Sequence, residues 1–214
     1  MDMSESTTSL DDLDFAPSGL AVGDEVADLL FREARTVNTF ADGQVSDEQV
    51  RAVYDVVRWG PTMMNTVPMR LLLVRSTQAR ERLAAHMAPG NRDRVLAAPL
   101  TIVVAADRDF HEHVDTLIPH VPDARARFAD PDAREAAARS SATLQTGYLI
   151  VGLRAAGLHV GPMAGMDAAG IDAEFFGHNG WRTLLVLNVG TPAGPESVRP
   201  RAPRLEFEQV AAVV

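Results

Sequence analysis

Two amphipathic helices are predicted near the start of the chain by the spacing of its hydrophobic residues. Residues 24–35 place apolar side chains three and four positions apart, so we expect a helix that delivers Arg35 at its end. Ser46 and Gln49 have the spacing of a capping box in front of a second apolar stripe. This second helix must end at Gly60, because a proline follows.

Three later segments are apolar throughout, without the alternation of hydrophobic and polar residues that marks a strand with one exposed face. Such runs are typical of strands covered on both faces, so we predict a central sheet sandwiched between helices. A loop over residues 61–68 precedes the first of these strands. The predicted strands are residues 71–74, 100–106 and 183–189.

A long helix is predicted over residues 132–156, which contain no proline and are followed by Gly157 as a C-terminal cap. At about 1.5 Å per residue it would be roughly 37 Å long. Its second half is apolar on nearly every side, which predicts a central helix buried all round and packed against a partner chain. Residues 199–214 are predicted to form an arm that ends in a short helix.

The chain has 214 residues, which suits one domain, and we expect that domain over residues 24–214. Residues 1–23 are predicted to be a flexible acidic tail, since the first 19 residues carry five acidic side chains and no basic one. That pattern is not a signal peptide. The chain has no cysteine, which removes disulfides, thiolate metal sites and cysteine nucleophiles. A cytoplasmic location fits these features.

Charge and hydropathy exclude several kinds of partner. The formal net charge of -9 disfavours a general surface for nucleic acid or for anionic membranes, because phosphate attraction needs clustered basic residues. No apolar run approaches the roughly 18 residues that a membrane-spanning helix needs. We therefore expect no nucleic-acid or membrane partner, and any anionic ligand must be held by locally placed arginines.

Common catalytic signatures are missing from the sequence. No GxGxxG follows a predicted strand, and neither GxxxxGK[ST] nor GxSxG occurs. A classical Rossmann dehydrogenase is therefore not indicated. His111 and His113 are two positions apart, so on a helix they point in different directions, unlike the i, i+4 pair of a zinc site. We predict a surface helix there and no metal site.

Four short segments that no core requires carry a family resemblance. The segments EARTVN and PTMMNTVP resemble the RxS and PSxxNxQP elements of the FMN-dependent nitroreductase family. The segments APGN and GPMAGMD resemble its GN and PxxGF elements, and the order along the chain is the same. Further phrases resemble the malonic semialdehyde reductase subgroup of pyrimidine catabolism, the RutE/HadB type. They are ARTxN, WGPT, the Pro-x-Arg of residues 68–70, LIVGLRAAGL, GPMAG and PRLEFE.

The resemblance implies a fold and an activity. The fold would be the α/β (α+β) nitroreductase type, three layers with a central, mostly antiparallel sheet flanked by helices, in an intertwined homodimer with an exchanged C-terminal arm. The cofactor would be FMN, with NADPH or NADH as hydride donor and ping-pong transfer through flavin N5. No catalytic side chain is implied. In the subgroup the acceptor is malonic semialdehyde, which is reduced to 3-hydroxypropanoate.

The resemblance also implies which residues contact FMN. Arg35 and Thr36 would hold its phosphate, joined by Arg201 or Arg204 of the C-terminal arm, with no choice between these two. An ordinary arginine at a helix end is the alternative for Arg35. Many relatives carry Arg or Lys where this chain has Asn38. The full predicted set is Arg35, Thr36, Asn38, Pro61, Thr62, Asn65, Asn91, Pro162, Met163, Ala164, Gly165, Arg201 and Arg204.

Several of these roles have alternatives. Asn91 would place an amide beside the flavin, or it is a simple turn residue. The backbone of residues 162–165 would approach the ring, so that Ala164, where many relatives have Glu, keeps this role. Asn65 would reach the flavin of the other subunit. Met63 and its neighbour Met64 would line the ring or the dimer interface, or simply pack.

Arg70 is the predicted partner of a substrate carboxylate, and a salt bridge at the start of a strand is its alternative. Two other functions stay open at this level. A reductase of relaxed specificity for nitroaromatics or quinones would use the same cofactor and site. A non-catalytic flavin-binding protein would hold the flavin but accept no hydride from a nicotinamide.

Overall fold

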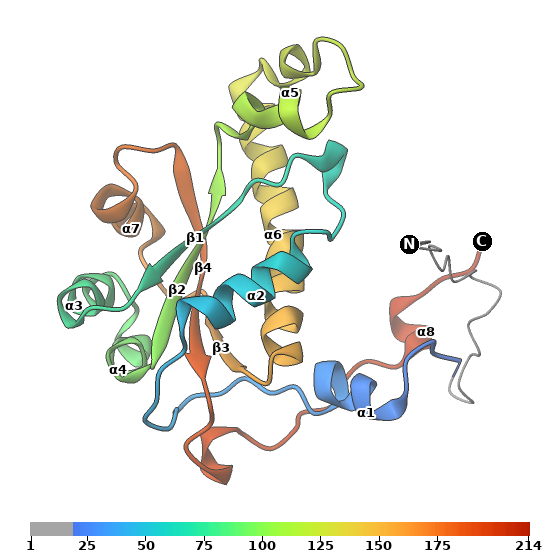
Figure 1. The fold of residues 1–214 in the computed structure, drawn as a ribbon. Helices are drawn as coiled ribbons and strands as arrows, with labels where there is room; N and C mark the ends of the chain where they lie inside the picture. The colour runs from blue at the N-terminus through green and yellow to red at the C-terminus, as the bar shows by residue number, and fades with distance from the viewer. Residues whose placement is uncertain (1–18) are drawn as a thin grey trace, which may run out of the picture.

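A four-stranded antiparallel sheet forms the centre of the fold in the computed structural model, which describes residues 19–214 (Figure 1). The strand order is β1-β2-β4-β3, and Leu71 of the first strand lies opposite Val104 of the second. The three predicted strands are confirmed, whereas the third strand in chain order was not predicted. The strands are β1 (Met69–Val74), β2 (Leu100–Asp107), β3 (His159–Met163) and β4 (Trp181–Gly190).

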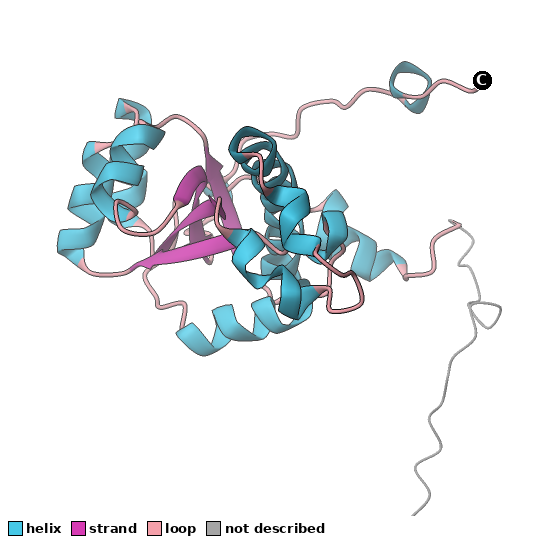
Figure 2. Ribbon diagram, turned by 90° about the horizontal axis from the view of Figure 1, so that it is seen from above, coloured by secondary structure: helices cyan, strands magenta, loops and turns pink. Residues whose placement is uncertain are grey.

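Helices cover both faces of the sheet, so the fold has three layers, as predicted (Figures 1 and 2). Successive residues of β2 point to opposite faces. Val104 packs in the core formed with α2 and α6, and Val103 packs in the core formed with α3, α4 and α7. All 8 residues of β2 are buried, which explains its unbroken apolar run. The helices are α2 (Asp47–Val57), α6 (Pro131–Ala155), α3 (Thr77–Ala85), α4 (Pro89–Ala97) and α7 (Ala168–Phe175).

The predicted capping box begins α2. The backbone N–H of Gln49 donates to Oγ of Ser46 at 3.2 Å, and the backbone N–H of Ser46 donates to Oε1 of Gln49 at 3.0 Å. Val53 and its apolar neighbours on one side of the helix are buried against α6. After the helix ends, Gly60 lies against the ring of Tyr148, and a Cβ on Gly60 would lie 2.3 Å from that ring.

The first helix is shorter than predicted. It consists of α1 (Asp24–Ala27) and the π-helical turn η2 (Asp28–Arg32), and it ends before Arg35. The chain becomes extended there because it pairs with the free edge of β3, where the backbone N–H of Val37 donates to the carbonyl of Val160 at 3.0 Å. Arg35 therefore projects from an edge segment of the sheet rather than from a helix end.

The long helix α6 is confirmed, with local signals at both ends. Oδ1 of Asp130 accepts the N–H of Ala133 at 2.8 Å and caps the N-terminus. At the other end Gly157 adopts a φ of 74°, a conformation that favours glycine. The N–H of Leu158 donates to the carbonyl of Leu153 at 2.9 Å, which completes a Schellman motif.

One side of α6 is open to solvent in the single chain. Leu149 and Leu153 are fully buried against the sheet, whereas Leu144 is 48% exposed. The prediction of burial on every side included a partner chain, so it stays a prediction for the open side. The sheet, α2, η2 and η5 contact other parts of the helix, and Leu144 lies where residues 19–214 leave it exposed.

The C-terminal segment extends from the body as an arm, as predicted (Figure 2). Residues 199–206 form neither helix nor strand and lead into the short helix α8 (Phe207–Val210). Leu205 is 67% exposed, Phe207 70% and Val210 65%. The arm therefore presents an apolar surface that the rest of the described chain leaves uncovered.

The remaining connections contain short helices. Within residues 19–214, no helix combines the length and the apolar character that crossing a bilayer requires. Most of the predicted tail lies outside the described residues, and residues 19–23 lead directly into α1. The short helices are η3 (Met63–Asn65), η4 (Phe110–His113), α5 (Val114–Leu117), η5 (Ala124–Phe128) and η6 (Pro195–Ser197).

Candidate functional site

A cleft of about 580 Å³ lies between the extended segment after η2, strand β3 and the start of the C-terminal arm. Val160 and Pro162 border it on β3, and Ile150 borders it on α6. Its distinctive feature is a concentration of guanidinium groups from elements far apart in the sequence. The arginines that line the cleft are Arg35, Arg94, Arg154, Arg199, Arg201 and Arg204.

The cleft brings together part of the predicted cofactor site. Three further arginines, Arg94, Arg154 and Arg199, line it although no sequence pattern points to them. The predicted residues of the first and last segments are all present, together with one residue of β3. They are Arg35, Thr36, Asn38, Pro162, Arg201 and Arg204.

None of the six arginines forms a salt bridge with a carboxylate in the described part of the chain. The neighbouring Arg32 shows the contrast, because it pairs with Asp24 at 3.0 Å and with Asp28 at 2.7 Å. In a chain of net charge -9, the cleft thus gathers positive charge in one hollow. Such a hollow attracts a compact anion.

Two of these arginines carry their charge in a partly desolvated place. Burial lowers the pKa of Arg94, with a further contribution from the charge of Arg199. Burial also lowers the pKa of Arg154, while the charge of Glu33 opposes this change. Removing a cation from water is costly unless an opposite charge compensates. An anionic ligand in the cleft would supply that compensation.

Arginines tie the C-terminal arm to η2 and to the extended segment that follows it. Nη2 of Arg35 donates to the carbonyl of Arg199, and Nη2 of Arg201 donates to the carbonyl of Arg32. Arg204 instead donates to two carbonyls of its own arm segment at 3.1 Å. Arg201 is therefore fixed between two elements at the cleft, and Arg204 is held locally within the arm.

Asn91 lies in the first turn of α4 and connects this helix to the segment after β3. Its Nδ2 donates to the carbonyl of Gly165 at 3.0 Å, and its Oδ1 accepts from Nη1 of Arg94 at 3.3 Å. Nη2 of Arg94 donates to the carbonyl of Val37 at 3.3 Å, and the amide of Asn188 donates to the carbonyl of Arg94 at 2.8 Å. Asn91 is thus part of a polar network and not a simple turn residue.

The predicted residues after β3 differ in what they expose. Pro162 lines the cleft, whereas Met163 is 3% exposed and packs in the core with α3, α4 and α7. Ala164 and Gly165 are exposed. A ligand at Met163 would therefore meet its backbone rather than its side chain.

The predicted residues of the 61–65 loop do not line the cleft. Nδ2 of Asn65 donates to the carbonyl of Leu117 at 2.9 Å, which places the loop beside α5, at the opposite end of α6 from the cleft (Figure 1). Thr62 accepts the N–H of Val67 through Oγ1 at 3.3 Å, and the hydroxyl of Tyr148 donates to the carbonyl of Pro61 at 3.2 Å.

The backbone of this loop is strained. Met64, Asn65 and Val67 have φ values of 48°, 54° and 42°, in the left-handed region that a β-branched residue rarely adopts. Each such residue costs about 1–3 kcal/mol and persists only where its surroundings enforce it. Met64 packs against the core formed with α2 and α6, while Met63 is 45% exposed. Packing against this core explains the presence of the Met64 side chain in the loop. The strain that the surroundings enforce makes the loop a candidate functional segment.

Arg70 occupies a position that does not suit its predicted role as a substrate partner. Its Nη2 lies 2.7 Å from Oδ2 of Asp107, and its Nη1 donates to the carbonyls of Val67 and Met69 at 3.0 Å. It is not among the residues that line the cleft. The structure shows the alternative, a salt bridge at the start of β1, and the role as substrate partner stays a prediction that this position does not favour. Its physical role is to join the strained loop to the end of β2.

Arg70→Met is expected to lower the free energy of unfolding by about 3 kcal/mol, because it leaves the buried carboxylate of Asp107 without its partner. Arg125→Met is a matched control, since the Arg125–Glu112 pair is exposed and is expected to contribute less than about 1 kcal/mol. Urea unfolding measures both. Equal stability of the two variants would contradict a structural role for the Arg70 pair.

Gly161 permits the close approach of the edge segment to β3. A Cβ on Gly161 would lie 2.3 Å from the backbone oxygen of Val37 and 3.2 Å from Nη2 of Arg94. Gly161→Ala is therefore expected to destabilise the fold by about 2 kcal/mol, because backbone must move. Gly43→Ala, with nothing within 4 Å, is expected to change stability by less than about 1 kcal/mol. Thermal unfolding measures the stability of both variants. Unchanged stability of Gly161→Ala would disprove the close approach.

The two histidines near residue 112 lie in η4, in keeping with the predicted short surface element. His113 is exposed, and His111 is partly buried with its ring edge-on to Phe110. Among residues 19–214, no group of three or more acidic or histidine side chains is placed to hold a metal ion.

Comparison with known proteins finds similar folds among solved structures and a protein family that matches most of the chain. The model of the Nitroreductase family matches residues 31–191. A Streptomyces coelicolor protein, provisionally named as an NADH dehydrogenase/NAD(P)H nitroreductase, is 53% identical over 188 residues, 87% of this chain and 95% of that protein. A provisionally assigned nitroreductase of Bacillus subtilis has a TM-score of 0.79 at 17% identity, over 89% of this chain and 99% of its own.

A second solved structure includes a flavin. It is a provisionally assigned nitroreductase from Exiguobacterium sibiricum in complex with FMN, with a TM-score of 0.76 at 17% identity, over 90% of this chain and 99% of that one. At this identity the two solved structures show the fold, while the family model and the Streptomyces relative cover most of this chain. The chain therefore belongs to the nitroreductase family.

Proposed function

We propose that the chain is an FMN-dependent NAD(P)H oxidoreductase. The observation that carries this proposal is the cleft beside β3, where six arginines gather without a carboxylate partner in residues 19–214. FMN carries a dianionic phosphate, and guanidinium groups bind phosphate oxygens through paired N–H donors. The names of the similar proteins, with NAD(P)H as reductant and FMN as bound cofactor, support the same assignment.

The residues present fit FMN. Arg35, Thr36 and Arg201 would hold the phosphate, because they meet where the arm is tied to η2 and to the extended segment that follows it. Arg204 lines the same cleft and would contribute a further charge. The ring would lie towards Gly165, which has no side chain. A Cβ added to Gly165 would lie 3.0 Å from Nδ2 of Asn91.

When bound, FMN supplies a carrier that takes a hydride at N5 from the nicotinamide and passes it to the acceptor. The chain contributes position and charge. Arg94, held by Asn91 and Val37, would place a cation near the ring and stabilise negative charge there. The exposed backbone at Ala164 and Gly165 would direct N–H groups towards the ring edge. We assign no catalytic side chain.

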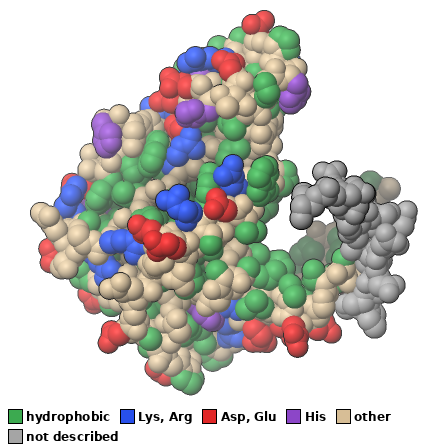
Figure 3. All heavy atoms as spheres, in the orientation of Figure 1, with side chains coloured by type: hydrophobic (Ala, Val, Ile, Leu, Met, Phe, Trp, Pro, Cys, Tyr) green, Lys and Arg blue, Asp and Glu red, His purple; other side chains and the backbone are tan. Residues whose placement is uncertain are grey.

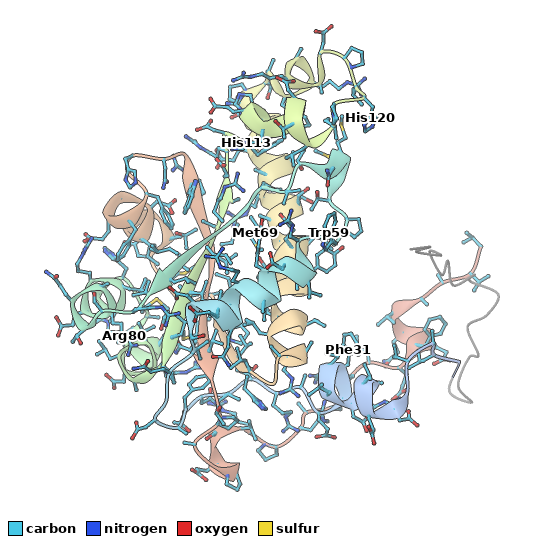
Figure 4. All side chains as sticks on the ribbon, in the orientation of Figure 1. Phe31, Trp59, Met69, Arg80, His113 and His120 are labelled. Atoms are coloured by element: carbon cyan, nitrogen blue, oxygen red, sulfur yellow. The ribbon has the colours of Figure 1, made fainter. Side chains whose placement is uncertain are left out.

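We further infer a homodimer in which the partner completes each site. Exposed apolar side chains gather over the end of α2 and over η2, as Figure 3 shows, and Figure 4 shows Trp59 and Phe31 on this side of the molecule. Trp59 is 78% exposed, Phe31 61% and Leu144 48%. The uncovered apolar arm around Phe207 would pack on the partner, which accounts for its exposure. The strained loop with Asn65 would then reach the partner's flavin.

For the acceptor we propose malonic semialdehyde, reduced to 3-hydroxypropanoate, on the resemblance of the segments WGPT, LIVGLRAAGL and GPMAG to that subgroup. The second candidate is a reductase of nitroaromatics or quinones, and the names of the similar proteins favour its nitroreductase activity. The two candidates share cofactor, donor and site, and they differ in what reoxidises the reduced protein.

Reoxidation of the reduced, FMN-loaded protein under anaerobic conditions separates these candidates. Malonic semialdehyde, a nitroaromatic compound and a quinone are each mixed with the reduced protein, and the return of the visible flavin absorbance is timed. Fast return with the semialdehyde supports the first candidate. Return with the nitroaromatic or the quinone alone replaces it with the second. No return with any of the three would overturn the proposed hydride transfer to these acceptors.

A further inference from the structure

Arg154 is an unusual arginine, because it is nearly buried and yet lines the cleft. It is 5% exposed and lies at the C-terminal end of α6. Buried arginines are normally paired with a carboxylate. Within residues 19–214 Arg154 has no such partner, and Glu33 acts on it only through its charge, which raises the pKa that burial lowers. Its positive charge is thus left for something in the cleft to neutralise.

The guanidinium of Arg154 is aimed by two fixed acceptors. Nε and Nη2 donate to the carbonyl of Leu29 in η2 at 3.0 and 2.7 Å. Nη1 lies 2.8 Å from Nδ1 and 3.3 Å from Nε2 of His159 at the start of β3. A guanidinium has five N–H donors. Because Nη1 meets a single ring, one of its N–H groups serves both distances to His159, and one N–H of Nη1 and one of Nη2 are left without an acceptor in the described chain.

The contact with His159 also defines the state of that ring. A guanidinium can only donate, so the ring nitrogen that takes this bond, Nδ1 at the shorter distance, accepts, and the ring must be neutral. Burial, and then the charge of Arg154, lower the pKa of His159, which agrees with a neutral ring. The charged groups around this pair are Arg154 itself on α6, Glu33 after η2, and the arginines of the cleft.

We infer that Arg154 binds the phosphate of the cofactor through its two free N–H groups, and that His159 is a positioning residue that holds the guanidinium in place. This inference rests on the proposed function, because the phosphate is that of FMN. The competing explanation is that Arg154 only joins α6, η2 and β3. Affinities for FMN and for riboflavin separate the two explanations, since riboflavin lacks the phosphate and is otherwise the same molecule.

Arg154→Met and Arg154→Lys test the binding role, with circular dichroism and thermal unfolding as folding controls. For Arg154→Met we expect FMN affinity to fall by about tenfold or more, the size of one lost bond to a charged group, and riboflavin affinity to stay within about twofold. Lysine keeps the charge but not the planar set of donors, so partial recovery of FMN affinity is expected. Equal losses for both ligands, or no loss for either, would overturn the inference.

The positioning role has its own pair of variants. In His159→Asn the amide oxygen can take over the acceptor position of Nδ1, whereas His159→Leu fills similar space without any acceptor. We expect the asparagine variant to keep FMN affinity within about twofold, and the leucine variant to lose about tenfold, with riboflavin affinity unchanged in both. Identical FMN affinities of these two variants would remove His159 from this role.

A titration with inorganic phosphate measures anion binding by Arg154 without FMN, so a failure of the proposed function can be distinguished from a failure of this inference. If the wild-type protein binds no FMN, the proposed function fails, and phosphate binding still tests Arg154. We then expect phosphate to bind the wild-type cleft more tightly than the Arg154→Met cleft. Equal phosphate affinities, or no phosphate binding by either protein, would overturn the role of Arg154 in anion binding.

Discussion

Removing the guanidinium groups of Arg35 and Arg201 together is expected to weaken FMN binding by about 100-fold or more. Each arginine would contribute about 1.5–3 kcal/mol as a bond to a charged group, and about 1.4 kcal/mol corresponds to a factor of ten in affinity. The two residues also tie the arm to η2 and to the extended segment that follows it, so their loss opens the cleft. Fluorescence titration of the flavin-free Arg35→Ala, Arg201→Ala double variant measures the change.

Two controls make this result specific. Riboflavin affinity is expected to fall much less than FMN affinity in the double variant, because an opened cleft weakens both ligands while riboflavin has no phosphate for the arginines to bind. Arg51→Ala removes an exposed arginine of α2 that does not line the cleft, and is expected to bind FMN as the wild type does. An FMN affinity that stays at the wild-type level in the double variant would show that the cleft is not the phosphate site.

Leu144→Asp is expected to convert the proposed homodimer into monomers. Leu144 is 48% exposed on the open side of α6, and in a twofold symmetric dimer each substitution occurs twice. Burying an unpaired carboxylate costs about 3–5 kcal/mol, so the dimer dissociation constant should rise by about 100-fold or more. Sedimentation velocity over a range of protein concentrations measures the change, and bound FMN should fall with it if the partner completes the site.

The matched control carries the same substitution on the other side of the sheet. Leu96→Asp lies on α4, where Leu96 is 42% exposed, and it is expected to leave the dimer intact. A dimer that persists in Leu144→Asp, or a wild-type protein that is monomeric at all concentrations, would contradict the interface placed on α6.

Elements that depend on local chemistry could be predicted from the sequence. The capping box of Ser46 and Gln49, the glycine cap at Gly157 and the fully apolar run of β2 each act within a few residues, so their signals are visible in the sequence. Strand β3 could not be predicted in this way. It contains Pro162, which a strand tolerates at a sheet edge, and the edge position becomes apparent only from the strand order.

Only the part of the candidate site that lies in recognisable sequence segments could be predicted. Arg35 and Arg201 lie in segments whose residues resemble a known pattern, and the structure places both in the cleft. Arg94 and Arg154 lie within helices, where a single charged residue usually indicates a solvated face. Their position in the cleft depends on how α4 and α6 pack against β3. The link between Arg70 and Asp107 likewise depends on the antiparallel pairing of β1 with β2.

The most direct test of the central claim is the reduction of the FMN-loaded wild-type protein by NADH and by NADPH in the absence of oxygen. The visible absorbance of the flavin is followed in a stopped-flow instrument, since the oxidised and reduced forms of the cofactor differ there. Hydride transfer from a nicotinamide to the bound flavin predicts that at least one of the two donors bleaches the flavin completely, with one donor consumed per flavin. A bound flavin that stays oxidised with both donors would contradict it.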